Sequence, residues 1–158
     1  MDYQIENKPA FTLLAKACKQ FTDDIKIPEF WDMCKKNGTL THLSELSSHP
    51  NNLRIGFADG LSFNGKSYMY YIGTPYEEKF IPEGYVTLFI PERTWVVFRC
   101  VNLSDQSANE DIFKKIYSEF FPSSDYNPAE YQLEVWPDDG RTHPKEFAEV
   151  WISVIKNT

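Results

Sequence analysis

The feature that most constrains the fold is a succession of predicted elements that occurs twice along the 158 residues. In the first half, apolar and β-branched runs predict strands at residues 11–21, 53–59 and 67–74, and residues 5–9 form a bend or a short first strand. A short helix is predicted between the first two of these strands, because Pro28 suits a first turn and Asn37-Gly38 is a typical stop. A polar stretch through Ser47, Ser48 and Pro50 follows this helix. The order is therefore strand, helix, strand, strand.

The second half repeats this order from residue 82 onward. Strands are predicted at residues 85–90, 94–101, 131–137 and 147–155. The helix between them is expected to begin at a capping box formed by Ser107 and Glu110, to carry one apolar stripe, and to end at Pro122. The last two strands are separated by a predicted turn around Asp138-Asp139-Gly140.

Two short matches support an internal duplication. Phe57-Ala58-Asp59-Gly60 resembles Trp136-Pro137-Asp138-Asp139-Gly140, and Tyr71-Ile72-Gly73 resembles Trp151-Ile152-Ser153. Neither half alone can bury much apolar surface, so two β-α-β-β modules, about residues 1–78 and 79–158, are expected to pair within one domain spanning residues 1–158. The predicted fold class is α+β, with a pseudo-twofold axis, an antiparallel sheet, helices on one face and a ligand cleft on the other.

Strand periodicity assigns side chains to these two faces. The aliphatic residues of the last two strands are expected to face the helices: Val150, Ile152, Val154, Leu133 and Val135. The residues between them are expected to face the cleft: Glu149, Trp151, Ser153, Glu134 and Trp136. The repeat places four residues of the first module on the same face: Ile55, Phe57, Met69 and Tyr71. The result is an aromatic groove that holds a carboxylate.

Such a groove suits an apolar or cationic organic molecule. Aromatic rings attract cations, and a bound cation favours the charged form of a carboxylate that has lost its hydration. The candidate ligand-binding residues are Glu149, Trp151, Tyr71, Trp136, Phe57, Trp31 and Met69. The alternative is that Glu149 hydrogen-bonds a neighbouring Tyr or backbone amide and that the aromatic residues, Trp31 first among them, fill core space. Arg99 is the basic residue expected to reach the groove, whereas Arg54 is expected on the opposite face.

Charge and motifs weigh against other functions. The net charge is −7 and the basic residues are scattered, which disfavours direct nucleic-acid binding by this chain. The three cysteines are not arranged as CxxC, and the three histidines fall in predicted loops, so no metal site and no cofactor are expected. No apolar run approaches the roughly 18 residues that cross a bilayer, and the N-terminus lacks signal-peptide features. We therefore expect reduced thiols, no membrane association and a cytoplasmic location.

Several segments together resemble one family. The stretch Ile81-Pro82-Glu83-Gly84-Tyr85, followed by Ile90-Pro91-Glu92-Arg93-Thr94-Trp95-Val96-Val97-Phe98, is similar to a stretch of GyrI-like, AraC-type effector-binding domains of bacterial transcription regulators. Tyr70-Tyr71-Ile72-Gly73 resembles the third-strand signature of these domains. Ala148-Glu149-Val150-Trp151-Ile152-Ser153-Val154 resembles their closing strand, where Ser153 replaces the usual Pro.

This resemblance implies a duplicated β-α-β-β fold whose last strand carries the polar anchor for a small-molecule ligand, a position that Glu149 matches. It also implies multidrug-like binding, in a stand-alone protein or in the sensor part of a transcription regulator with a DNA-binding domain or protein partner. The resemblance leaves two alternatives open. One is a hydrolase of reactive electrophilic molecules, in which Glu149 is the general base and Tyr71 polarises the substrate. The other is an interaction protein similar to a gyrase inhibitor. The natural ligand and the oligomeric state are left unspecified by the sequence.

Overall fold

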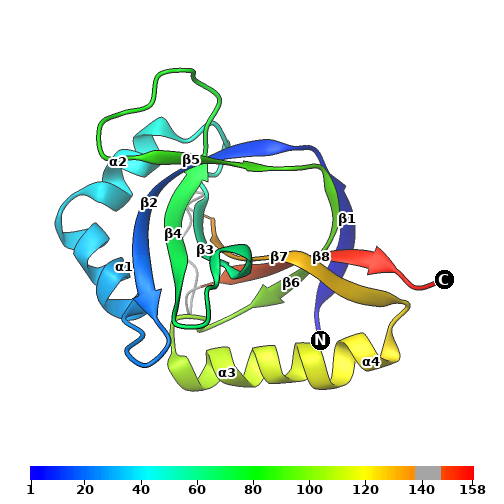
Figure 1. Cartoon of the computed structure of the whole chain (residues 1–158). Helices are drawn as coiled ribbons and strands as arrows, with labels where there is room; N and C mark the ends of the chain where they lie inside the picture. Colours follow the sequence, from blue (N-terminus) through cyan, green and yellow to red (C-terminus); the bar gives the residue numbers. More distant parts are fainter. Residues whose placement is uncertain (138–146) are drawn as a thin grey trace.

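The computed structural model describes residues 1–137 and 147–158. These residues form one antiparallel eight-stranded sheet with the strand order β1-β6-β8-β7-β3-β4-β2-β5 (Figure 1). The strands of the first half are β1 (Tyr3–Lys8), β2 (Phe11–Phe21), β3 (Arg54–Asp59) and β4 (Ser67–Pro75). Those of the second half are β5 (Val86–Ile90), β6 (Arg93–Cys100), β7 (Tyr126–Trp136) and β8 (Ala148–Lys156).

The strand order is symmetric about the β7 and β3 pair. When β1 to β4 are exchanged with β5 to β8, the same order is read in reverse. Two-residue links connect β1 to β2 and β5 to β6, although the strands of each pair lie near opposite edges of the sheet. The predicted α+β class and antiparallel sheet are confirmed. A further strand precedes the β-α-β-β unit in each half: β5 confirms the strand predicted at residues 85–90, and β1 shows that the segment at residues 5–9, left open as a bend or a strand, belongs to a strand.

The described α-helices cover the outer face of the curved sheet, and a 3-10 turn (Gly60–Ser62) connects β3 to β4. In the first half, α1 (Ile27–Lys36) and α2 (Thr39–Leu46) pack on β2 and β4 through a cluster that includes Leu14, Phe30, Leu43 and Ile72. In the second half, α3 (Gln106–Lys115) continues through a π-helical turn (Ile116–Phe120) into α4 (Phe121–Ser123). Figure 1 shows α1 and α2 outside one side of the sheet and α3 outside the other. None of the described helices is long and apolar enough to cross a lipid bilayer.

The inner face of the sheet carries a separate apolar cluster. Its buried members come from six of the eight strands or the loops next to them: Leu13, Ala15, Leu53, Ile55, Phe57, Ile90, Trp95, Val97, Leu133, Val135 and Trp151. This arrangement confirms that the α-helices lie on one face of the sheet, and the other face is the one for which the groove was predicted. We call the side of the sheet that carries this cluster the concave face.

The helices differ from the prediction in three details. The chain forms α2 where a polar stretch was predicted, with Leu40 and Leu43 buried against the sheet. The N-cap of α3 is Asp105, whose carboxylate accepts a hydrogen bond from the Ala108 N–H, so the predicted capping box at Ser107 is wrong. Pro122 lies inside the last short turn instead of ending the helix before it.

Gly73 in β4 lies where two strands approach closely. A Cβ atom at this position would be 2.3 Å from the Leu14 carbonyl oxygen and 2.8 Å from the Ala15 Cβ. These are atoms of the neighbouring strand β2, which cannot rotate away as a flexible side chain can. The sheet therefore requires glycine at this position.

Candidate functional site

A continuous row of side chains crosses the concave face. Residues directly opposite each other in antiparallel strands share a face, and the pairing runs from Val97 to Trp151, to Leu133, to Phe57 and to Tyr71. The Phe57 and Tyr71 rings are stacked, with centroids 6.0 Å apart and an interplanar angle of 24°. Trp151 and Phe57 are buried, and Tyr71 is half-buried. The face predicted for Trp151, Phe57 and Tyr71 is therefore confirmed.

Met69 lies on the same face beside this row. It is two residues from Tyr71 on β4 and is paired with Asp59 of β3. Its side chain is half-buried. Asp59 raises the pKa of the Tyr71 hydroxyl, in addition to a larger effect of burial. Tyr71 is therefore neutral at physiological pH, with a hydroxyl that can donate a hydrogen bond.

Glu149 precedes Trp151 by two residues on β8 and therefore lies on the same face. It is opposite Arg99 of β6 and Val135 of β7. Its carboxylate is half-buried and accepts a hydrogen bond of 3.0 Å from the Trp151 indole Nε1. The indole thus acts as the polar partner of the carboxylate. The alternative considered from the sequence was a hydrogen bond between Glu149 and a neighbouring Tyr or a backbone amide.

Two residues that the sequence did not predict complete the surroundings of Glu149. The Lys8 ammonium lies 4.2 Å from the centroid of the Trp151 ring and 3.2 Å from Oε2 of Glu6. His49 belongs to the loop before β3. Burial lowers the pKa of His49, the charge of Lys8 lowers it further, and Glu149 has the opposite effect.

Arg99, the basic residue expected to reach the groove, lies on the predicted face, because it is paired with Glu149. Its side chain is exposed, and its guanidinium carbon lies 4.9 Å from the centroid of the Phe147 ring. Arg54 is paired with Trp136 and shares the outer face with it, as predicted. The cation next to the indole of Trp151 is therefore Lys8, from a strand distant in sequence.

The faces predicted for the β7 residues Trp136, Glu134, Leu133 and Val135 are wrong. Leu133 is paired with Trp151 on the concave face, so Leu133 and Val135 lie on that face, and Glu134 and Trp136 lie on the outer one. Tyr71 is paired with Phe57 and Trp151 with Leu133, so the structural counterpart of Phe57 is Leu133. The sequence match between Phe57 and Trp136 was three residues out of register, and an odd shift reverses the face of a strand residue.

Trp31 joins Trp136 on the outer face, so the structure does not bring it into the groove. The two indole rings meet edge to face with centroids 4.9 Å apart, and Trp31 Nε1 donates a hydrogen bond of 2.9 Å to the Tyr70 hydroxyl. Burial raises the pKa of Tyr70, and the nearby charge of Glu134 adds to this effect. These contacts join α1 to the sheet beside the boundary between the halves.

Glu134 is a half-buried carboxyl on this outer face. It is paired with Gly56 and Val150, beneath α3, and its hydrogen-bond partner there is Asn109. Burial raises the pKa of Glu134 to about 7, against the smaller opposing effect of the hydrogen bond with Asn109. The carboxyl group is therefore partly protonated near neutral pH.

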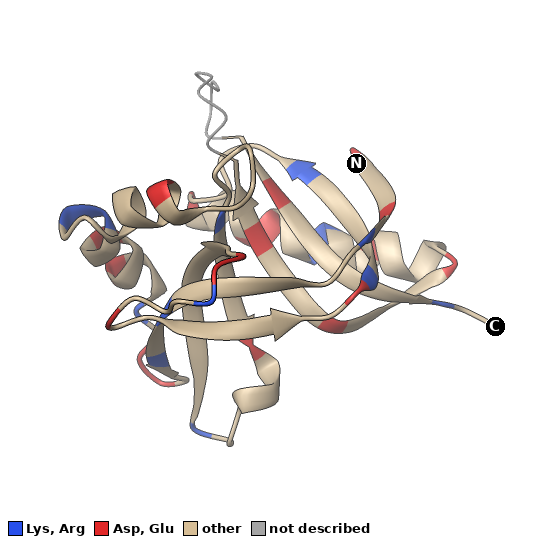
Figure 2. Cartoon of the chain, turned by 90° about the horizontal axis from the view of Figure 1, so that it is seen from above, with Lys and Arg blue, Asp and Glu red and all other residues tan. Residues whose placement is uncertain are grey.

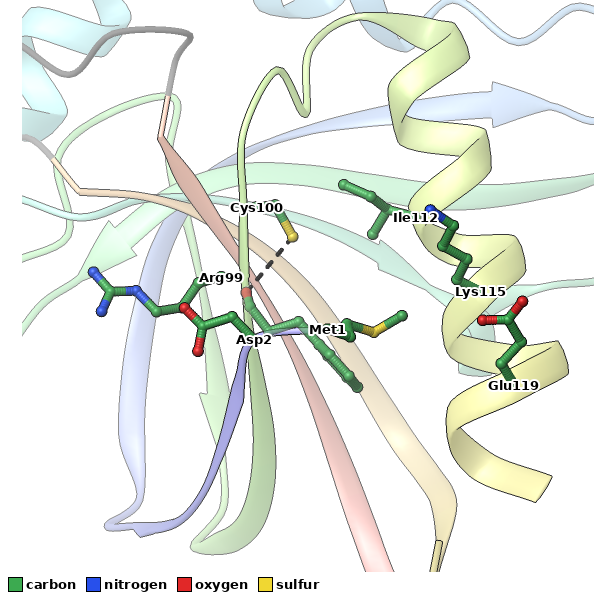
Figure 3. Close-up of a pocket in the computed structure, with 8 residues that line it drawn as sticks. Met1, Asp2, Arg99, Cys100, Ile112, Lys115 and Glu119 are labelled. Carbon is green, nitrogen blue, oxygen red and sulfur yellow. Dashed lines mark hydrogen bonds between the residues drawn. The ribbon is translucent and has the colours of Figure 1, made fainter. Parts of the chain in front are cut away.

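A cavity of about 330 Å³ lies on the outer side, between the N-terminus, β6 and α3 (Figure 3). Its charged lining residues are of both signs: Asp2, Arg99, Lys115 and Glu119. Burial raises the pKa of the Cys100 thiol in its wall to about 11, so this thiol stays protonated and a poor nucleophile. A cavity with mixed charge and no Trp or Tyr in its lining fits a lipophilic cation less well than the concave face does.

The remaining sequence expectations concern charge, metals and catalysis. Figure 2 shows the Lys and Arg positions spread over strands, helices and loops. Among the described residues, no group of His, Cys, Asp and Glu could hold a metal ion. His143 and the predicted turn at residues 138–140 lie outside the described residues.

The hydrolase alternative needs Glu149 and Tyr71 to act on one small substrate. They belong to β8 and β4, which are separated by β7 and β3 in the sheet. Three strand spacings amount to about 14 Å between their backbones. This separation places them on different parts of the concave face and does not favour a shared catalytic role.

The chain is similar to known proteins over nearly its whole length. A family profile described as integron-associated effector binding protein matches residues 4–154. A putative bacterial transcription regulation protein from Staphylococcus aureus MU50 has a TM-score of 0.73 and 18% identity, over 98% of each chain. The protein SAV2435, in a structure bound to tetraphenylphosphonium, has a TM-score of 0.75 and 15% identity, over 98% of this chain and 94% of the other.

A third similar structure belongs to a larger protein. The regulator EcmrR, in a complex with DNA, has a TM-score of 0.67 and 10% identity, over 99% of this chain but 58% of the EcmrR chain. Comparison with curated proteins finds no match. At these identities the solved structures establish a shared fold, and the family profile establishes the family.

Proposed function

The chain belongs to the family of integron-associated effector-binding proteins, and we propose that it binds a lipophilic organic cation or a neutral amphiphile on the concave face of its sheet. Glu149 supplies the negative charge in this proposal. Trp151, Phe57 and Tyr71 supply aromatic surface, and Met69 supplies an adaptable apolar side chain. Trp136 and Trp31 are left out, because they lie on the outer face.

The observation that supports this proposal best is the position of the Lys8 ammonium. It lies over the ring of a tryptophan whose N–H is bound to a carboxylate. This combination of a π face and a nearby negative charge is the chemistry that recognises organic cations. The same ring face can therefore receive the positive charge of a ligand, provided that the ligand takes the place of Lys8.

The comparisons agree with a cationic ligand. The name of the matching family refers to effector binding, and a protein of the same fold has been solved with tetraphenylphosphonium, a lipophilic cation. We infer that several compounds of this kind bind, because aromatic and methionine side chains adapt to different apolar shapes.

We also propose that the domain acts as a sensor whose DNA contacts are made by a partner. A protein of the same fold, EcmrR, is part of a DNA complex and is longer than this chain. The net charge of −7 is unfavourable for a direct approach to phosphates. In this proposal, ligand binding on the concave face changes the behaviour of a separate DNA-binding domain or protein.

The test is calorimetric titration of tetraphenylphosphonium into the native protein and the Glu149→Gln variant. Gln retains an oxygen that accepts from the Trp151 indole but loses the charge. We expect the variant to bind the cation more weakly by about 1–3 kcal/mol, the usual loss for a charged partner. Glu119→Gln, which removes one negative charge on the outer side, is the matched control and should bind as the native protein does.

A neutral compound of similar shape, triphenylphosphine oxide, separates charge from apolar contact. Its affinity should change little in Glu149→Gln, because the apolar surface is unaltered. Equal tetraphenylphosphonium affinities of the native protein and Glu149→Gln would remove Glu149 from the site and overturn this proposal.

A further inference from the structure

We infer that Lys8 is a tethered cation that occupies the ligand site of the empty protein and has to leave the Trp151 ring before an organic cation binds. This inference rests on the proposed function, because it assigns Lys8 the role of an internal competitor at the same ring. It makes Lys8 a residue that sets the affinity and selectivity of the site.

The Lys8 ammonium lies over the Trp151 ring and belongs to the more exposed of the two side chains. The Trp151 side chain is only 6% exposed, whereas the Lys8 side chain is 26% exposed and has its ammonium 4.2 Å from the ring centroid. A ligand that stacks on this ring face takes the position of the ammonium. Binding and the present position of Lys8 are therefore mutually exclusive.

Lys8 can leave the ring without breaking the sheet. It is the last residue of β1, an edge strand, and is paired with Arg93. Its other partner is Glu6, whose carboxylate is 40% exposed. Ion pairs this exposed are weak and are easily exchanged for water. Rotation of the four-carbon side chain moves the charge toward solvent while the backbone pairing of β1 with β6 stays intact.

The charges around the ring explain why displacement favours a cation. Glu149 and Glu6 both remain near the ring when Lys8 has left, and burial, the largest cause of the lowered pKa of His49, still disfavours a positive charge on that imidazole. An incoming cation restores the charge balance that the departure of Lys8 removes. A neutral ligand displaces Lys8 without this compensation, so the native site discriminates against it.

The expected effect follows from the strength of the contact. At a partly exposed site, the position of a cation over an aromatic ring is favoured over its position in solvent by a factor of about 2 to 30. The apparent affinity for a ligand equals the intrinsic affinity multiplied by the fraction of protein molecules in which the site is free. Removal of the Lys8 charge should therefore raise the affinity for tetraphenylphosphonium by about 3- to 30-fold.

The experiment compares three variants by calorimetric titration with tetraphenylphosphonium. Lys8→Met retains an unbranched side chain without the charge and should bind 3- to 30-fold more tightly, by the reasoning above. Lys8→Arg retains a cation and should bind as the native protein does. Lys16→Met is the matched control, because Lys16 also lies over an aromatic ring, 4.4 Å from the Tyr85 centroid, but on the outer face of β2.

A second measurement observes Lys8 directly. In the ligand-free protein, the ε-methylene protons of Lys8 should have NMR signals shifted upfield by the Trp151 ring. Addition of tetraphenylphosphonium should move these signals to the usual lysine position. Signals at the usual position before the addition would show that Lys8 does not occupy the ring and would overturn the inference.

The outcomes separate this inference from the proposed function. If Lys8→Met binds tetraphenylphosphonium no more tightly than Lys16→Met, while Glu149→Gln binds more weakly than the native protein, the inference is wrong and the proposed function stands. If Glu149→Gln binds as the native protein does, the proposed function itself fails. If Lys8→Met is the one lysine variant that binds tetraphenylphosphonium more tightly, and the Lys8 signals are shifted as expected, the result supports the inference and the proposed function.

Discussion

Replacing Glu134 with Gln should stabilise the protein at pH 8 and change its stability little at pH 5. Burial raises the pKa of Glu134 from its ordinary value of 4.5 to about 7 in the folded chain. Between these two values the folded state holds a proton that the unfolded state has released, so the free energy of unfolding falls as the pH rises toward 7. Each tenfold difference in acid constant is worth about 1.4 kcal/mol, which gives a total of about 3 kcal/mol above pH 7. Gln is neutral at every pH and avoids this loss.

The assay is urea denaturation of the native protein and Glu134→Gln at pH 5 and pH 8, with the slopes compared to check that both unfold in the same way. The matched control is Glu130→Gln. The hydrogen bond from Arg93 is the main cause of the lowered pKa of Glu130, so this variant should gain no stability at pH 8. If Glu134→Gln has the same pH dependence as the native protein, the carboxyl group is not protonated on folding and the reasoning is refuted.

Three further predictions concern packing, capping and thiol reactivity. Gly73→Ala should lower the free energy of unfolding by about 2–4 kcal/mol, because the added methyl group meets the backbone of the next strand. A urea midpoint of unfolding close to that of the native protein would contradict this prediction. Asp105→Ala should destabilise by about 1 kcal/mol, and Ser107→Ala by much less, because Asp105 is the observed cap; equal effects in thermal melts would argue against this assignment. Cys34 and Cys100 should react with Ellman's reagent only on unfolding, because both thiols are buried and have raised pKa values; rapid labelling of either in the native protein would count against the packing described.

The element order and one face of the sheet could be predicted because they depend on local patterns. In β8 one parity is aliphatic and the other contains Glu149, so the alternation itself separates the two faces. In β7 both parities contain large apolar residues, Leu133 and Trp136, and a bulge between Pro128 and Gln132 changes the register. Alternation shows that two faces exist, but which face turns toward the helices depends on pairing with β3 and β8.

The parts that sequence reasoning missed depend on weak propensity or on distant contacts. α2 has the sequence TLTHLSEL, whose Ser and Thr residues favour helices only weakly, and the spacing of Leu40 and Leu43 was its available signal. No local pattern connects Lys8 to Trp151. They meet because β6 pairs with β1 on one side and with β8 on the other.

Because two short links connect opposite edges of the sheet, the first strand of each half pairs with a strand of the other half. β1 extends the sheet of the second half beside β6, and β5 extends the sheet of the first half beside β2. Neither half can complete its own sheet without a strand encoded in the other. The two halves therefore unfold as one cooperative unit, and a chain divided between β4 and β5 yields fragments that have to assemble together to fold. The same connection places Lys8, a residue of the first half, over a tryptophan of the second, so the proposed ligand site belongs to neither half alone.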